Sequence, residues 1–258
     1  MRTKRTVAFR LMPDALMLTI LVLVIVGCSG TKVTTKSSVE LPRYQIRTIA
    51  LVPFTTLETP QVREVLDQPP FSVPVEARRS DIAISAPAIG ISVPANTEQL
   101  HRETVTVPTS AGDIVTQLLW SHLKTREGVT VLMPSEAAKV LASRATLQPP
   151  TGQSAGVTVA KQLKVDASLI GQVLVYQERV GGRFGASPPA TVGFEAKLVA
   201  ADGQVLWVGN YYERQRPMIE DVMGFIQRGG VFVTAEELAA YGVEHLLLKF
   251  PFGKIEER

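Results

Sequence analysis

The sequence predicts an α/β fold: a single mixed sheet with helices packed on it, preceded by a signal peptide and a flexible tether. Three observations predict it. Short apolar runs of strand type alternate with helical periodicity after residue 110. The segment from Val192 to Tyr212 alternates apolar and polar residues around an Asp202-Gly203 turn, which is typical of a β-hairpin. The 258 residues suffice for one good-sized domain.

The elements are expected in the order strand, insertion, helix, strand, two helices, three strands and two helices. Residues 47–54 form a short buried-type strand that Pro53 ends. Ser110 and Asp113 resemble a capping box, as do Thr234 and Glu237, and each pair predicts the start of a helix. The remaining predictions are strands at 129–133 and 167–177, and helices beginning at 134, 155 and 218.

The chain's one cysteine, Cys28, follows an uncharged apolar run at 15–26 and a basic segment before it. A run of this length suits a signal-peptide core of roughly 7–15 residues better than a spanning helix of about 20. Ile25, Val26 and Gly27 precede Cys28, and together they resemble the lipobox of bacterial lipoproteins. This resemblance implies cleavage before Cys28 and a lipid on its thiol. The alternative is a signal anchor with a buried cysteine.

The lipobox resemblance also implies a location. Ser29, not an aspartate, would be the second residue of the mature chain, which by resemblance to enterobacterial lipoproteins implies the periplasmic face of the outer membrane. The expected organisation is a signal peptide at 1–27, a tether at 28–45, a periplasmic α/β domain at 46–250 and a tail at 251–258. A proline-rich insertion at 55–109 interrupts the domain.

Charge and cysteine content exclude several classes of function. The signal segment holds four of the 27 basic and one of the 24 acidic residues, so the mature chain is neutral and we expect no nucleic-acid partner. With Cys28 lipidated, no thiol remains for disulfides or thiolate chemistry. The three histidines are isolated in sequence and match no metal motif. We expect no metal site and no cofactor.

Two groups of residues are candidate partner contacts. In the insertion, Ile82, Ile84, Ile89 and Ile91 alternate with small residues in two short extended pieces. The insertion is either a loosely packed loop or an arm that adds a strand to a partner's sheet. The second group clusters at a strand end, where aromatics with arginine suit an interface or a solvated terminus. Its members are Tyr211, Tyr212, Arg214 and Arg216.

A wider resemblance covers residues 47–54 and 110–212. The sequences R-T-I-A-L-V-P-F, V-D-A-S-L-I-G and A-D-G-Q-V-L-W resemble a lipoprotein superfamily. It includes the curli-secretion channel lipoprotein, the penicillin-binding-protein activators and the amino-terminal domain of TolB. The resemblance implies binding and assembly and offers no catalytic residue. The connection at 181–189 is too short for the membrane hairpin of the curli channel.

We therefore expect a non-enzymatic lipoprotein that assists an envelope machine for secretion or cell-wall synthesis, with an envelope protein as partner. Two alternatives remain: a self-assembling subunit of a curli-type export channel, and a serine esterase. The esterase would use Ser154, within G-Q-S-A-G, with Asp166 or Asp202 and His245. The prolines at 149 and 150 argue against the strand that a nucleophile elbow needs, and Ser154 is more simply a helix N-cap.

Overall fold

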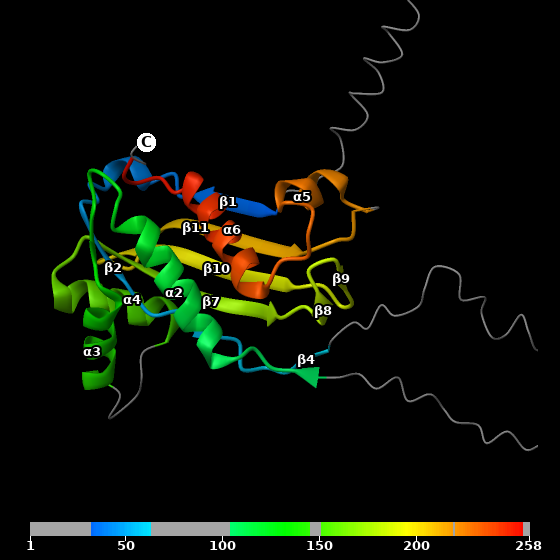
Figure 1. The fold of residues 1–258 in the computed structure, drawn as a ribbon. Coiled ribbons are helices and arrows are strands. Elements are labelled where there is room, and N and C mark those ends of the chain that lie inside the picture. The colour runs from blue at the N-terminus through cyan, green and yellow to red at the C-terminus, as the bar shows by residue number, and fades with distance from the viewer. Residues whose placement is uncertain (1–31, 63–103, 145–150, 219, 255–258) are drawn as a thin grey trace, which may run out of the picture.

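The computed structural model describes residues 32–62, 104–144, 151–218 and 220–254. Within these residues, a seven-stranded mixed sheet runs in the order β1-β11-β10-β7-β2-β6, and β3 pairs with β7 beyond the end of β2 (Figure 1). The α/β class and the single mixed sheet are confirmed. The signal segment and most of the insertion, with Ile82, Ile84, Ile89 and Ile91, lie outside the described residues. No described helix is long and apolar enough to cross a bilayer.

The sheet has an antiparallel half and a parallel half. Antiparallel pairing joins β1, β11, β10 and β7, whereas β7, β2 and β6 are parallel. The strands of the sheet are β1 (Val33–Ser37), β2 (Thr48–Leu51), β3 (Thr55–Thr56), β6 (Thr130–Leu132), β7 (Ala167–Gln177), β10 (Thr191–Ala200) and β11 (Val205–Arg214). Two small hairpins pair β4 (Gln61–Val62) with β5 (Thr104–Val105), and β8 (Gly181–Gly182) with β9 (Gly185–Ala186).

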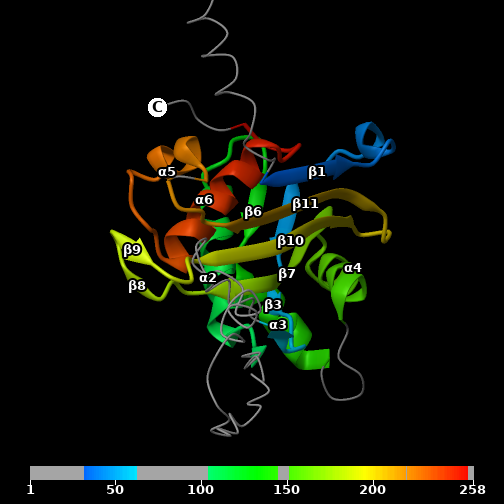
Figure 2. The same ribbon diagram turned by 90° about the vertical axis from the view of Figure 1, so that its right-hand side faces the viewer.

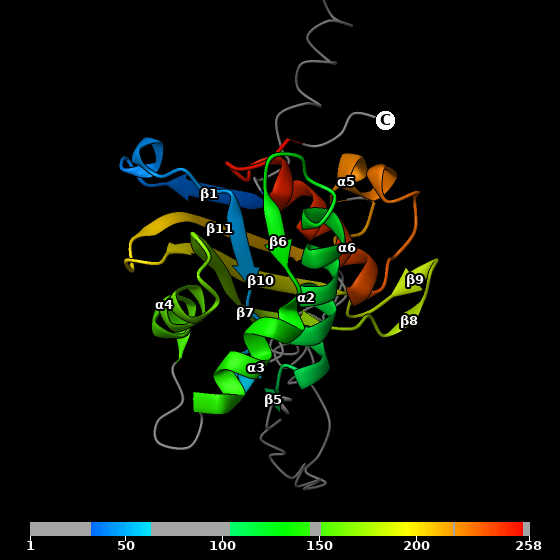
Figure 3. The same cartoon turned by 90° about the vertical axis from the view of Figure 1, so that its left-hand side faces the viewer.

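Helices cover both faces of the sheet (Figures 2 and 3). The helices are α2 (Thr109–Leu123), α3 (Pro134–Arg144), α4 (Gly152–Leu163), α5 (Val222–Gln227) and α6 (Ala235–Leu248), with the short η1 (Leu41–Arg43) after β1. One core lies under α2 and α6, and it includes Phe194, Trp207 and Leu246. The second core lies under α3 and α4, with Val140, Val159 and Ile170. Alternation along each central strand supplies both cores.

The β10–β11 hairpin confirms the strongest local prediction. Phe194 and Leu198 are fully buried under α6, while Glu195 and Lys197 point to the other face and are partly exposed. The turn at Asp202-Gly203 is present: the Gln204 amide donates to the Asp202 carboxylate over 2.9 Å. Gly203 adopts a φ of 98°, where a side chain would be strained.

The predicted flexible tether at 28–45 is wrong for its second part. Val33–Ser37 forms the edge strand β1, which pairs antiparallel with β11 from Tyr211 to Trp207. Val33 is 6 % exposed, and its side chain joins the core under α6. Burial of one valine and pairing of the strand's backbone outweigh a composition that otherwise suits a tether. The domain therefore begins by residue 33, not 46.

Of the two capping boxes predicted at helix starts, one is confirmed and one is wrong. Thr234 and Glu237 form a complete capping box at the start of α6. Ser110 does not cap α2: the helix begins one residue earlier, after Pro108, which makes no side-chain hydrogen bond. Pro108 has extended backbone angles and occupies the N-cap position. The proline, rather than Ser110, therefore marks where the helix begins.

The start of the predicted tail is bound to the domain. Arg126 is 7 % exposed, and its guanidinium donates to the carbonyls of Leu247 and Phe252, the latter over 2.7 Å. Glu127 and Lys254 also form a β-bridge. Burial lowers the pKa of Arg126. The carbonyl oxygens near the end of α6 accept hydrogen bonds from its guanidinium and stabilise the positive charge.

Candidate binding surface and the polar cluster behind it

Strand β11 carries the candidate site because its alternate residues face different surroundings. Tyr211 and Glu213, and Gln215 directly after the strand, lie on the inner side of the sheet and are 1 %, 4 % and 0 % exposed. Tyr212 points to the opposite face and is 59 % exposed. The strand end predicted as a contact patch is thus split by the sheet into a buried polar side and an open side.

Tyr211 is therefore a correction to the predicted contacts. Its ring packs on Phe194, with 5.3 Å between ring centroids, and it is too buried to contact a partner. A Cβ added to Gly242 of α6 would lie 2.3 Å from this ring, so the glycine is what lets the helix approach so closely. Arg214 is half-buried and Arg216 is exposed, so both remain accessible with Tyr212.

The open side forms a surface that no described helix covers. The register places Gly193 beside Tyr212, Glu195 beside Asn210 and Thr34, and Lys197 beside Val208 and Lys36. We call this surface the open face. It consists of Thr34, Lys36, Glu195, Lys197, Val208, Asn210 and Tyr212, all partly or fully exposed. Helix α4 lies lower on this side of the sheet, away from β1 (Figure 2).

The open face combines one aromatic ring with uncharged polar groups, two lysines and one glutamate. The Tyr212 ring lies over Gly193, where an added Cβ would meet its Cδ2 at 2.9 Å. Glu195 and Lys197 form an ion pair on the same face. An exposed tyrosine among hydrogen-bonding side chains has the composition of a protein interface, in which tyrosine is enriched.

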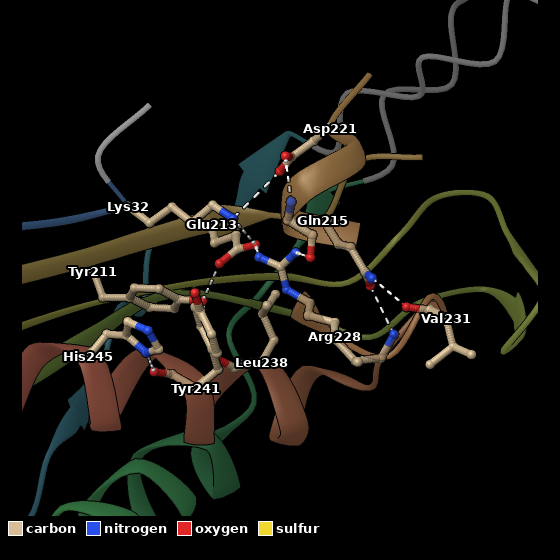
Figure 4. Close-up of polar contacts among 12 residues, drawn as sticks. Lys32, Tyr211, Glu213, Gln215, Asp221, Arg228, Val231, Leu238, Tyr241 and His245 are labelled. Atoms are coloured by element: carbon tan, nitrogen blue, oxygen red, sulfur yellow. Dashed lines mark hydrogen bonds and ion pairs between the residues drawn. The ribbon is translucent and has the colours of Figure 1, made fainter. Parts of the chain in front are cut away.

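Behind the open face, a buried polar cluster fixes the end of β11 (Figure 4). Glu213 accepts a hydrogen bond from the Tyr211 hydroxyl over 2.8 Å and forms ion pairs with Lys32, at 3.2 Å, and with Arg228. Lys32 also lies 3.6 Å from Asp221, which caps α5 by accepting from the Gly224 amide. One carboxylate thus joins the residue before β1, the end of β11 and the end of α5.

Gln215 holds the other end of the same segment. Its amide donates to the Val231 carbonyl over 2.7 Å, and its side-chain oxygen accepts from the Val233 amide over 2.9 Å. The Arg228 guanidinium lies 5.2 Å from the centre of the Tyr241 ring, which itself stacks on His245. Residues 216–233, which we call the α5 segment, are therefore fastened to the sheet and to α6 at both ends.

Burial governs the ionisation of this cluster. Burial, followed by the nearby Arg228 charge, lowers the pKa of Lys32, although Asp221 opposes that effect. Burial also lowers the pKa of Arg228 and raises the pKa of the Tyr211 hydroxyl well above its usual range. At neutral pH the Tyr211 hydroxyl therefore remains protonated and is a hydrogen-bond donor within the cluster.

The residues of the esterase alternative are not brought together. Ser154 lies in the first turn of α4, and its hydroxyl donates to the Thr151 carbonyl; Thr151, not Ser154, is the N-cap. Asp166 accepts from the Thr48 amide and hydroxyl. His245 lies on α6, on the opposite face of the sheet from α4, with Nδ1 2.9 Å from the Tyr241 carbonyl. The sheet thus separates the serine from the histidine.

Sequence reasoning missed Lys32, Glu213, Gln215, Asp221 and Arg228. One signal was present: Glu213 and Gln215 directly follow the predicted strand, which ends at Tyr212, and continue the alternation that starts at Tyr211. Polar residues there need buried partners. Among the described residues, no group of three or more histidine, cysteine and acidic side chains is arranged to hold a metal ion.

Comparisons with known proteins find similarity only between structures. No protein-family model matches the sequence, and no curated protein sequence matches it either. The chain is similar to a PelC dodecamer from Paraburkholderia phytofirmans at 13 % identity, covering 84 % of this chain and 96 % of that one, with a TM-score of 0.40. It is also similar to the LpoB C-terminal domain from Salmonella enterica at 7 % identity, covering 67 % and 85 %, with a TM-score of 0.35.

A third similar structure is the lipoprotein GNA1162 from Neisseria meningitidis, at 12 % identity, covering 70 % of this chain and 99 % of that one, with a TM-score of 0.33. TM-scores this low carry no information about partners or assembly. The function proposed below therefore rests on residues of this chain.

Proposed function

We propose that the chain is a lipid-anchored periplasmic protein that binds and helps to assemble an envelope machine for secretion or cell-wall synthesis. Its lipid is carried by Cys28 at the outer membrane, and it performs no catalysis. The proposal places it in the superfamily of the curli-secretion channel lipoprotein, the penicillin-binding-protein activators and TolB. The lipobox-like residues before Cys28 and the confirmed β10–β11 hairpin support this placement.

The open face is the observation that carries the binding role. Tyr212 is 59 % exposed. The strand that carries it is held in place, because the hydrogen bonds of Glu213 and Gln215 fix the strand end from its inner side. A rigid aromatic loses little conformational entropy on binding, which suits it to anchor an interface. Arg214 and Arg216 follow it and supply donors at the rim.

The lipid would act by position. Acyl chains on Cys28 hold the domain at the membrane surface and raise its effective concentration for partners embedded there. Two or more acyl chains make such anchoring stable. An affinity that is too weak to form the complex in solution would therefore be high enough to form it at the membrane.

A photo-crosslinking amino acid in place of Tyr212 tests this proposal in cells of the native host. We expect one discrete adduct with an envelope protein, and we expect Cys28→Ala to abolish it. The matched control carries the photo-reactive residue at Leu248, which is 61 % exposed and lies on α6. Equal adducts from both positions, or an adduct unaffected by Cys28→Ala, would contradict the proposal.

Adducts between copies of this chain alone would move the assignment to the export-channel alternative. Strand β1 is the edge strand of the described sheet next to β11, and its outer edge could pair with a strand of another copy. Ring assemblies in detergent and conductance in lipid bilayers would then be required of the purified protein.

A further inference from the structure

Exposed apolar side chains gather at one end of the domain. Of the nine large apolar residues that are strongly exposed in the described chain, five come from the α5 segment and the β8–β9 hairpin. We call them the apolar end: Val180, Phe184, Met218, Val222 and Ile226. Phe184 is 92 % exposed and Ile226 is 60 % exposed. Clustered apolar exposure of this kind marks an interaction surface.

The two parts of the apolar end lie together at the ends of β7 and β11 (Figures 1 and 2). The Phe232 amide donates to the Arg183 carbonyl over 2.7 Å, and the Arg179 guanidinium donates to the Phe232 carbonyl over 2.6 Å. Val222 and Ile226 are four residues apart on α5, so both project from one side of the helix. The hairpin and the α5 segment are thus joined.

The chain that leads to the lipid reaches the domain at this same end. Lys32 immediately precedes β1, and its ammonium contacts Asp221 at the start of α5. Four peptide steps separate Lys32 from Cys28, and they span at most about 14 Å when fully extended. Wherever the lipid on Cys28 enters the bilayer, α5 must lie within a short distance of it.

Charge at the apolar end favours a hydrophobic contact. Residues 178–186 and 211–230 together with Lys32 contain six basic and four acidic residues, a net charge of +2, and Glu237 from α6 pairs with Arg183. Glu213 and Asp221 also neutralise Lys32, and Glu213 neutralises Arg228. Binding to anionic lipid would need an uncompensated basic patch. The apolar side chains themselves are the groups available to enter the membrane interface.

We propose that the apolar end rests on the bilayer that holds the lipid, with Ile226, Val222, Met218 and Phe184 inserted among the lipid headgroups. This inference rests on the proposed lipidation of Cys28. The domain is then held by its lipid and by its own surface, with the strands rising from the membrane and the open face directed sideways, toward neighbouring membrane proteins. The contact needs no anionic lipid.

A single-cysteine probe tests the orientation. The lipidated chain, whose own thiol is blocked by the lipid, carries Ile226→Cys labelled with an environment-sensitive fluorophore. In vesicles of phosphatidylcholine we expect blue-shifted emission and strong quenching by lipids brominated near the headgroup. The control is Val39→Cys, an exposed site beside η1 at the far end of the sheet, where we expect emission as in water.

The outcomes separate this inference from the lipidation itself. A chain that does not float with vesicles has lost the anchor, which would overturn the proposed function. A chain that floats while the label at 226 stays in water would overturn the orientation alone. A blue shift that requires added envelope proteins, or equal quenching at 226 and 39, would also overturn it. Val222→Ser with Met218→Ser should reduce the quenching at 226 several-fold.

Discussion

Lys32 and Glu213 form an ion pair, with 3.2 Å between Nζ and Oε1, that ties the residue before β1 to the end of β11. Glu213 is at the centre of the cluster, because Arg228 and the hydroxyl of Tyr211 also bind its carboxylate. The chain that leads to Cys28, the strand that carries the open face and the α5 segment are therefore joined through one buried carboxylate, that of Glu213. Changes to it test whether the three act as a unit.

Glu213→Gln should destabilise the domain strongly. The amide keeps the shape but removes the charge that compensates Arg228, whose side chain is 4 % exposed. Removal of one partner from a buried ion pair costs about 3–5 kcal/mol. We expect a loss of this order in the free energy of unfolding, measured by urea denaturation. Glu220→Gln, at an exposed position of the same segment, is the control and should change stability little.

Gly171→Ala should also destabilise the protein, through packing. A Cβ at this position would lie 2.1 Å from the Phe54 ring and 2.5 Å from the Glu195 carbonyl oxygen. Overpacking of this kind costs roughly 1–3 kcal/mol. Gly182→Ala is a matched control, because nothing lies within 4 Å of an added Cβ there. Comparable losses from both variants would show that Phe54 does not occupy this position.

The capping box of α6 should make stability depend on pH. The Thr234 amide, followed by the Arg183 charge, lowers the pKa of Glu237 below its ordinary value. The carboxylate therefore adds stability that is fully present above about pH 4.5, near the pKa in the unfolded chain, and is lost as the pH falls through the lower folded value. Chemical denaturation at pH 3–7 should show this loss in the wild type.

Glu237→Gln should flatten that part of the pH profile and leave the neutral-pH fold intact. Glu236→Gln changes the neighbouring acidic residue of the same turn and serves as the control. A profile that responds equally to both substitutions would mean that general charge, and not the capping box, sets the pH dependence.

A fluorophosphonate probe tests whether the protein has esterase activity. We expect no labelling of the folded protein, because α4 and α6 lie on opposite faces of the sheet and keep Ser154 away from His245. A known serine esterase in the same reaction controls for probe activity. Labelling that disappears in Ser154→Ala would contradict the binding role.

The hairpin of β10 and β11 could be predicted from sequence because its signals are local. Apolar alternation and the Asp202-Gly203 turn occur within about twenty residues and depend on no distant partner. The same holds for the α6 capping box, whose two members are three residues apart. Local signals of this kind survive in almost any tertiary context.

Strand β1 and the buried cluster could not be predicted because they depend on distant contacts. Val33–Ser37 is polar apart from its valine, and it forms a strand because β11 offers a backbone edge with which it pairs. Likewise, Lys32 is far in sequence from Glu213 and Arg228, and only the fold shows that the three side chains meet. The apolar end combines α5 with a separate hairpin for the same reason.

The intact mass of the protein extracted from membranes tests the central proposal most directly. We predict a mature chain that begins at Cys28 and carries the added mass of a diacylglyceryl thioether. The Cys28→Ala variant should lack this mass and leave the membrane fraction. A wild-type mass without lipid, or a Cys28→Ala variant that fractionates and migrates like the wild type, would contradict it.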